Sequence, residues 1–207
     1  MINSKDMRLK NFVREQTKEA LLKCGRKLVE ECGANELSAR KLAGRSNSSV
    51  GMIYTIFETM DQLVGEINAI TLKELLFQME RVVLGENPFN NLNRYAEVLT
   101  SYILANPNLW ELLYSRHLAL NAPKSSMAEA RVIKKIDILI GLQAARLVKG
   151  IGGREKRLAI KVLEMSLFAL SGYLLGNKLN PKSGLNRNTL CQLLMNTYIA
   201  GLACLKG

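Results

Sequence analysis

Residues 37–57 have the sequence LSARKLAGRSNSSVGMIYTIF, and this stretch decides the fold. Ser38 and Ser49 each stand just before a short apolar-periodic segment, where a hydroxyl can accept a hydrogen bond from the first turn of a helix. Between the two predicted helices, Asn47 suits the left-handed backbone conformation of a tight turn. A short helix, a turn and a second short helix form a helix-turn-helix, whose second helix can enter the DNA major groove.

Apolar residues with helical spacing flank this stretch on both sides. Upstream, the pattern over Phe12–Cys32 predicts an amphipathic helix that ends at Gly33. Downstream, Thr59 and Gln62 have capping-box spacing and begin a long predicted helix. We therefore expect a helix-turn-helix domain of three helices over residues 1–58, followed by a linking helix over residues 59–86.

The rest of the chain has the helix-start signals of a helical domain. Asn87-Pro88 and Asn106-Pro107 each place a capping residue before a proline that is tolerated at the first helical position. Ser126 and Glu129 again have capping-box spacing. Helices are expected near residues 89–105, 107–120, 126–149, 154–175 and 185–205. Since no stretch alternates as a half-buried strand would, the fold class is all-α, with a larger all-helical domain over residues 59–207.

Composition excludes several classes of protein. The 207 residues are 48% hydrophobic, which is enough for a buried core, and carry a net charge of +11. The apolar stretch over residues 162–176 is too short and too interrupted for a membrane span, and no signal peptide is visible, so we expect a cytoplasmic chain without a membrane partner. Four dispersed cysteines, expected as buried apolar residues, and one histidine cannot build a zinc site. With no catalytic motif, we expect neither an enzyme nor a cofactor.

Three segments carry a resemblance to a known family. Leu28–Gly33, Leu37–Ala43 and Ser49–Phe57, together with Leu63, resemble the DNA-binding domain of the TetR (tetracycline-repressor-like) family of transcriptional regulators. The similarity runs from about Arg14 to Ile67. It implies that the helix over residues 50–56 is the recognition helix. The DNA-contacting residues it implies are Ser38, Ala39, Arg40, Ser49, Val50, Gly51, Met52, Tyr54 and Thr55.

Several of these residues have a structural interpretation as well. Ser38 and Ser49 would cap helices in any protein, Gly51 could be a packing glycine, and Tyr54 could be a core tyrosine rather than a phosphate ligand. Two departures from the family pattern weaken the DNA interpretation. Ser46-Asn47-Ser48 replaces the usual Ala-Gly-Val of the turn, and Met60 stands where a phosphate-binding lysine is common. The alternative is a helical ligand-binding or adaptor protein with weakened or lost DNA binding.

Charge and apolar faces supply the remaining expectations. Residues 1–57 hold 11 basic and 6 acidic side chains, a net charge of +5, which favours a nucleic-acid partner.

The last two predicted helices are apolar nearly all round and would form the four-helix interface of a homodimer. The predicted interface residues are Leu163, Leu167, Leu174, Leu190, Leu194 and Tyr198.

The resemblance also implies an effector site in the larger domain. Four side chains with polar tips on large rings are the candidates for binding an unidentified small molecule: Tyr102, Trp110, Tyr114 and His117. Aromatic core packing is the alternative for each of them. Taken together, the expected protein is a regulator, most commonly a repressor in this family, that a small-molecule effector releases from a pseudo-palindromic operator in double-stranded DNA.

Overall fold

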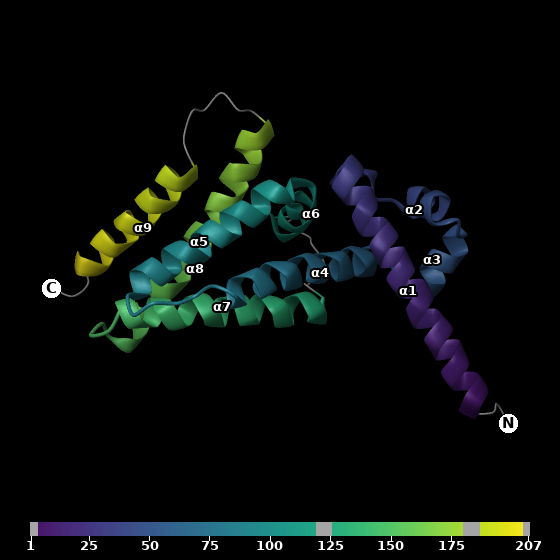
Figure 1. Ribbon diagram of the computed structural model, residues 1–207, viewed down its shortest axis with the longest axis horizontal. Helices are drawn as coiled ribbons and strands as arrows, with labels where there is room; N and C mark the ends of the chain where they lie inside the picture. The colour runs from purple at the N-terminus through teal and green to yellow at the C-terminus, as the bar shows by residue number, and fades with distance from the viewer. Residues whose placement is uncertain (1–3, 119–125, 180–186, 205–207) are drawn as a thin grey trace. The chain divides into compact units, whose positions relative to one another are not determined.

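The computed structural model describes residues 4–118, 126–179 and 187–204, and every regular element in these ranges is a helix (Figure 1). The all-α prediction is confirmed. The elements are α1 (Ser4–Cys32), the 3-10 turn η1 (Ala34–Glu36), α2 (Ala39–Ser46), α3 (Val50–Ile56), α4 (Met60–Glu80), α5 (Pro88–Ala105), α6 (Pro107–Leu118), α7 (Met127–Leu147), α8 (Gly153–Leu179) and α9 (Arg187–Cys204).

The chain divides into two packing units. The first comprises Met1–Thr71 with Asn108–Ala130, and the second comprises Leu72–Pro107 with Arg131–Gly207. Helices α4 and α7 each contribute residues to both units. The division into functional domains at residue 58 stays a prediction.

The first unit is built around the helix-turn-helix. Its core joins α1, α2, α3, α4 and α6 through side chains that are almost completely buried. Those with the least exposed surface are Leu21, Val29, Leu42, Ile53, Phe57, Leu63, Ile67 and Leu109. Burial of each such side chain contributes about 1.5–3 kcal/mol to folding. The apolar spacing of the sequence therefore fixes which faces of the two short helices turn inward.

Helix α1 is longer than its pattern predicts. It begins at Ser4, well before Phe12, and ends where Gly33 takes a φ of 95°, as expected for a glycine after the last turn. Residues 7–16 are all exposed, so local helix propensity rather than packing sets this first part. The expectation of buried cysteines is wrong for Cys32, which is exposed in the last turn of α1.

The second unit contains α5, α8 and α9 and parts of α4 and α7. The Asn87 carboxamide accepts hydrogen bonds from the Phe89 and Asn90 amides, with Pro88 at the first helical position, so the predicted start of α5 is confirmed. A buried hydrogen bond of 3.0 Å from Asn91 to Gln143 links α5 to α7. Helices α5, α8 and α9 contact one another in pairs.

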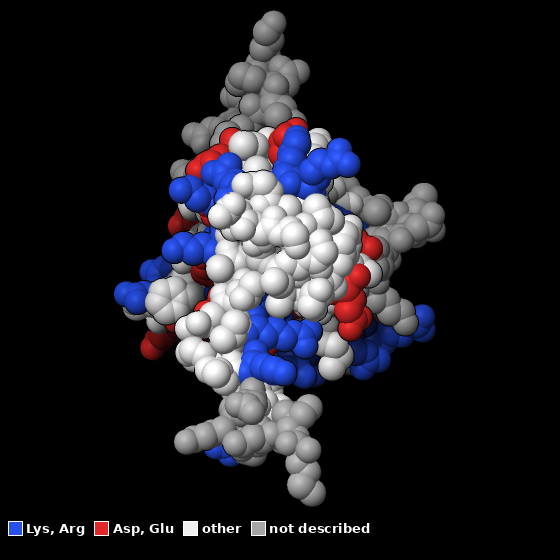
Figure 2. All heavy atoms as spheres, turned by 90° about the vertical axis from the view of Figure 1, so that its right-hand side faces the viewer, with Lys and Arg blue, Asp and Glu red and all other residues white. Residues whose placement is uncertain are grey.

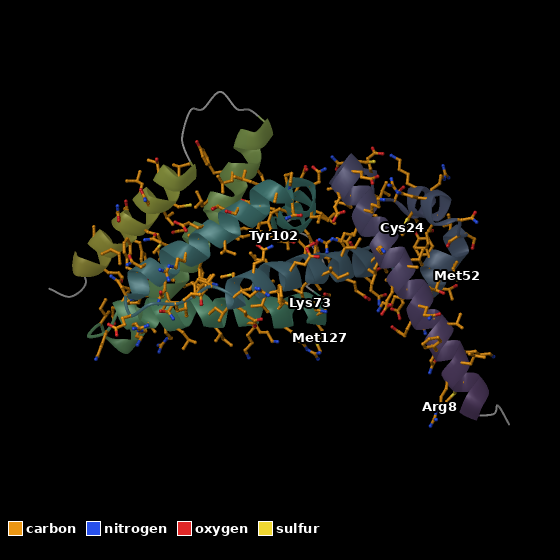
Figure 3. All side chains as sticks on the ribbon, in the orientation of Figure 1. Arg8, Cys24, Met52, Lys73, Tyr102 and Met127 are labelled. Carbon is orange, nitrogen blue, oxygen red and sulfur yellow. The ribbon has the colours of Figure 1, made fainter. Side chains whose placement is uncertain are left out.

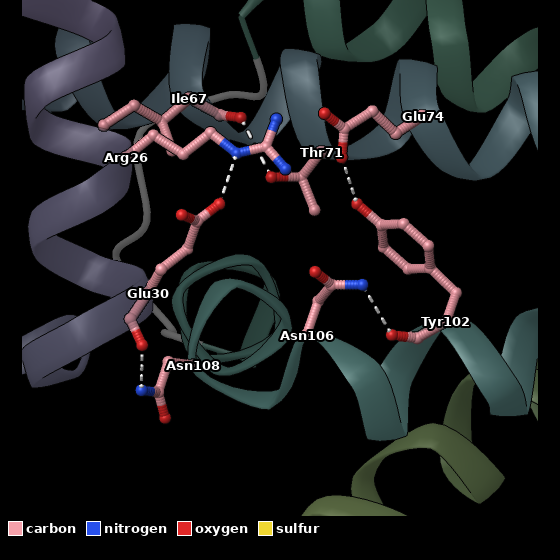
Figure 4. Close-up of polar contacts among 8 residues, drawn as sticks. All are labelled: Arg26, Glu30, Ile67, Thr71, Glu74, Tyr102, Asn106 and Asn108. Carbon is pink, nitrogen blue, oxygen red and sulfur yellow. Dashed lines mark hydrogen bonds and ion pairs between the residues drawn. The ribbon is translucent and has the colours of Figure 1, made fainter.

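Helix α6 begins at Pro107 as predicted, but without the expected cap. Asn106 donates its side-chain amide back to the carbonyl oxygen of Tyr102 at 3.0 Å, so it closes the end of α5 instead (Figure 4). The capping box of α7 is formed as predicted. The Glu129 amide donates to the Ser126 hydroxyl at 3.1 Å, and the Ser126 amide donates to Glu129 at 2.6 Å.

Candidate functional site

The helix-turn-helix is held by hydrogen bonds within residues 38–57. The Ser38 hydroxyl accepts from the Lys41 amide at 3.3 Å, and the Ser49 hydroxyl accepts from the Met52 amide at 3.0 Å, so both predicted caps are confirmed. Asn47 has a φ of 52°, the left-handed conformation predicted for it. The Ser48 amide donates to the Ala43 carbonyl at 3.0 Å and closes the turn. The Ser-Asn-Ser sequence thus builds the turn without a glycine.

Helix α3 has one buried face and one open face. Ile53 and Ile56 are buried, whereas Val50, Met52 and Tyr54 keep 40%, 45% and 47% of their surface exposed. Figure 3 labels Met52 on the outer side of α3. The interpretation of Tyr54 as a core tyrosine is therefore wrong, because its ring lies on the open face.

Small residues leave the backbone of α3 accessible. A Cβ built on Gly51 would meet only the Ser49 hydroxyl, at 3.8 Å, so packing does not require this glycine. Thr55 is exposed and donates its hydroxyl to the Gly51 carbonyl at 2.9 Å. The absence of side-chain bulk at Gly51 permits close approach of a large partner to this face.

Free positive charge is scarce on α2. Lys41 pairs with Glu36, and Arg45 pairs with Glu31 of α1. The Arg45 hydrogen bond lowers the pKa of Glu31 and raises that of Arg45, so the pair is charged at neutral pH. Arg40 is exposed and has no ion-pair partner among the residues that the structure describes. Ala39 is buried and has little surface for a partner.

Figure 2 faces the side of the first unit that carries α3. Lys and Arg side chains gather above and below a centre that carries neither cations nor carboxylates. The backbones of a duplex are anionic, and they flank a groove floor of neutral base edges. A neutral surface with cations above and below it has the same order of charge, and Asp and Glu side chains lie beside the upper cations and along the right edge of this surface.

A second candidate surface lies on α8 and α9. These two helices line a groove of about 910 Å³ whose walls are almost entirely apolar. Its lining includes Leu158, Val162 and Tyr173 of α8 and Leu190, Leu193, Leu194 and Tyr198 of α9. The Tyr198 hydroxyl donates to the Ala159 carbonyl at 3.0 Å, and burial raises the pKa of Tyr198 to about 12.

The six predicted interface residues fall into two groups. Leu190, Leu194 and Tyr198 line the groove. Leu163, Leu167 and Leu174 instead lie in the core of the chain, with at most 5% of their surface exposed, so they have no area left to offer a partner. The opposite side of α8, which carries Leu158 and Val162, is the exposed one.

Apolar residues on both sides of α8 give it an unusual composition. In the described part of the chain, one helical segment, Gly153–Gly176, is long and apolar enough to cross a membrane, by length and composition alone. Its inner leucines pack in the core and its outer ones line the groove, which accounts for apolar residues all round.

Comparison with solved structures identifies the arrangement. A TetR regulator from Streptomyces coelicolor superposes with a TM-score of 0.66 at 16% identity, over 91% of this chain and 98% of that one. BioQ of Mycobacterium smegmatis superposes with a TM-score of 0.69 at 16% identity, over 92% of this chain and 98% of BioQ. FadR of Bacillus halodurans, a fatty acid degradation regulator, superposes with a TM-score of 0.62 at 14% identity, over 88% of this chain and 98% of FadR. The chain has the TetR-regulator fold. No protein-family model and no curated protein matches its sequence.

Within this TetR fold, the predicted effector residues are divided between the two packing units. Tyr102 belongs to the second unit, where it is buried and donates its hydroxyl to Glu74 at 2.9 Å (Figure 4). Trp110 and Tyr114 belong to the first unit, where Trp110 is buried and Tyr114 half-buried. The side chain of His117 lies outside the described residues. For Tyr102 and Trp110 the burial favours core packing.

The sequence analysis did not predict the complete burial of two polar side chains in the first unit. Asn68 of α4 is completely buried, and neither of its amide atoms has a hydrogen-bond partner among the described residues. Glu129 of α7 is equally buried; one carboxylate oxygen accepts from Ser126 and the other has no partner there. Such atoms cost about 1–3 kcal/mol each when unsatisfied. A signal was present, because Asn68 interrupts the apolar run from Ile67 to Ile70.

Helical register places Asn68 about one turn after a glycine that faces the α7 cap. Gly65 of α4 faces the α7 cap, since a Cβ there would lie 3.1 Å from the Ser126 Cβ and 3.4 Å from a Glu129 oxygen. Asn68 follows Gly65 by about one turn on a neighbouring face of α4. In the residues that the structure describes, no three His, Cys, Asp or Glu side chains come together as metal ligands would.

Proposed function

We propose that this protein is a sequence-specific DNA-binding regulator of transcription. The observation that carries the proposal is the open face of α3, which is capped by Ser49, anchored by Ile53 and Ile56 and bordered by cations. Val50, Met52 and Thr55 would meet base edges and thymine methyl groups, and Tyr54 would donate its hydroxyl to a phosphate. Ser38, Arg40 and Ser49 would contact the backbone at the two helix starts, and Ala39 would contribute only through its backbone.

We propose further that the regulator is a homodimer formed through the α8–α9 groove. The groove is apolar and open, and Leu193 on its rim keeps 61% of its surface exposed. Large exposed apolar patches usually mark protein contacts. A two-fold dimer would place two copies of α3 on half-sites about 34 Å apart, which requires a pseudo-palindromic operator. Since Leu163, Leu167 and Leu174 are covered, the contact would use Leu190, Leu194, Tyr198 and the outer side of α8.

A matched pair of variants tests the dimer. Leu193→Glu places a charge in the groove, whereas Leu142→Glu places the same charge on α7 at a leucine that is 59% exposed and outside the groove lining. Light scattering should find monomers for Leu193→Glu and dimers for both Leu142→Glu and the unaltered chain. A dimeric Leu193→Glu protein would place the contact on another surface.

The mode of regulation completes the proposal. We propose a cytoplasmic repressor, without catalytic activity, that a small-molecule effector releases from its operator. The buried amide of Asn68 and one buried carboxylate oxygen of Glu129 have no hydrogen-bond partner among the described residues, so both are candidates to bind this effector, and Tyr114 is a half-buried ring of the same unit. His117 and Tyr102 stay candidates by resemblance alone.

Binding to duplex DNA at several salt concentrations tests the main proposal. Phosphate contacts release counterions, so the affinity of a DNA-binding regulator should fall steeply as salt rises. Fluorescence anisotropy with a labelled duplex measures that slope directly. A folded dimer that binds no duplex at low salt would favour the alternative, a helical ligand-binding or adaptor protein. Two observations support that alternative: Met60 occupies the usual lysine position, and Lys41 and Arg45 are already paired.

A further inference from the structure

The helix-turn-helix lacks the free cations that a phosphate backbone needs. Within the fully described stretch 38–57 there are three basic residues, and two of them, Lys41 and Arg45, are neutralised by Glu36 and Glu31. Arg40 is the one left free. Met60 at the first position of α4 adds no charge and packs against the core. Charge for binding DNA must therefore come from another element of the first unit.

Helix α1 extends beyond the core on the side of α3. Lys18 marks the point at which the helix leaves the core. Its ammonium lies 2.8 Å from Glu66 of α4 and 5.9 Å from the ring centre of Phe57, the residue just after α3. The preceding residues of the helix, from Ser4 to Thr17, would span about 21 Å at 1.5 Å per residue. Figure 3 shows α1 running from Cys24, beside the helix-turn-helix, to Arg8 in the extension, past the end of α3.

The extension carries a ridge of unpaired cations. Lys10 and Arg14 precede Lys18 at intervals of four residues, so their side chains follow one another along one side of the helix. Both are exposed, and neither has a carboxylate partner among the described residues. The ridge therefore continues from the contact of α1 with α3 and α4 outward into solvent.

The position of the ridge relative to α3 fits a duplex. Figure 2 shows a group of Lys and Arg side chains directly below the neutral centre, and Figure 3 shows Arg8, which belongs to the same extension, below Met52 of α3. The major groove is about 12 Å wide, and a projection of about 21 Å is long enough to reach the backbone at its edge. The side chains that would meet that backbone are a lysine and an arginine, which bind phosphate irrespective of base sequence.

We propose that Lys10 and Arg14 of the α1 extension bind phosphates of the same duplex that α3 recognises, and supply the charge absent from Met60 and from the paired cations of α2. The inference rests on the proposed DNA-binding function and assigns it a second, sequence-independent surface. Loss of this surface weakens binding to every sequence alike, whereas loss of α3 contacts changes which sequence is preferred.

The test compares two double variants with equal loss of charge. Lys10→Ala/Arg14→Ala removes the ridge, and Lys23→Ala/Lys73→Ala removes two exposed lysines, one on the opposite side of α1 and one on α4. Each protein is titrated against a labelled duplex of random sequence, about three helical turns long, at several salt concentrations. Circular dichroism and light scattering verify that every variant is folded and has the oligomeric state of the parent.

The expected result is specific to the ridge. The slope of log affinity against log salt should decrease in magnitude by about 1.8 for Lys10→Ala/Arg14→Ala, and affinity near 0.1 M salt should fall more than tenfold. The Lys23→Ala/Lys73→Ala protein should keep the parental slope. An unchanged slope for the ridge variant, or an equal decrease in both variants, would overturn this inference alone. If the unaltered protein binds no duplex, the proposed function fails and this inference fails with it.

Discussion

Substitution of Ser49 separates the structural role of this serine from its proposed role on DNA. Its hydroxyl caps α3 by accepting from the Met52 amide at 3.0 Å, and it is exposed at the start of the open face. Aspartate is as good a cap as serine, and a negative charge is favourable at the start of a helix. Alanine removes the cap without adding charge. The two variants, Ser49→Asp and Ser49→Ala, should therefore rank in one order for folding stability and in the reverse order for affinity for DNA.

The magnitudes follow from the cap and from Coulomb repulsion. Ser49→Ala should lower the free energy of unfolding by about 1 kcal/mol, whereas Ser49→Asp should leave it within about 0.5 kcal/mol of the parent. On DNA, a carboxylate about 5 Å from a phosphate is repelled by about 0.8 kcal/mol in water. Two neighbouring phosphates would then weaken binding about tenfold or more.

Urea denaturation and duplex titration of both proteins measure the two effects. The unfolding free energy should rank Ser49→Asp above Ser49→Ala, and the affinity for duplex DNA should rank them in the reverse order. The control is Asn87→Asp, which adds the same charge to the cap of α5, outside the helix-turn-helix, where the side chain accepts from the Phe89 and Asn90 amides; it should keep the parental affinity for duplex DNA. A Ser49→Asp protein that binds duplex as tightly as the parent would refute the placement of α3 against DNA.

Three further substitutions have defined outcomes. Tyr54→Phe should weaken binding to all duplexes about fivefold, because one hydrogen bond to a phosphate is lost, and should leave dimerisation unchanged. If fluorescence anisotropy gives the variant the affinity of the parent, the phosphate contact is excluded. Asn68→Leu should raise the free energy of unfolding by about 1–3 kcal/mol, because it removes an unsatisfied buried amide, and a less stable variant in urea would show that the amide is bonded. Burial, followed by the nearby carboxylate of Glu164, raises the pKa of Asp137, so the folded state binds this proton more tightly than the unfolded state. The stability of the parent should therefore fall as pH rises through that pKa; Asp137→Asn should be the more stable protein at neutral pH, and equal stability in urea at that pH would contradict this.

The local structure of the first unit was predictable from single residues. Serine caps, the left-handed Asn47 and the glycine after α1 are each determined by hydrogen bonds and sterics within a few residues, so the pattern over residues 37–57 specified the motif. The Ser126–Glu129 capping box is equally local. Such features do not depend on which distant segments pack together.

Features that depend on packing were not predictable. Helix α8 is apolar on both sides, so its periodicity could not tell Leu163 in the core from Val162 in the groove. Asn106 lies between the end of α5 and the start of α6 and could form a hydrogen bond at either. Its carboxamide donates to the end of α5. The pairing of Arg45 with Glu31 joins residues from separate helices, and this pairing removes a cation that the sequence offers to DNA.

Selection of duplexes from a random-sequence pool by the purified protein, at a low and a high salt concentration, tests the central claim most directly. We expect enrichment of a pseudo-palindromic sequence whose half-sites are about one helical turn or somewhat more apart, with affinity that falls steeply as salt rises. A folded, dimeric protein that enriches no sequence and binds no duplex at the lower salt concentration would contradict it.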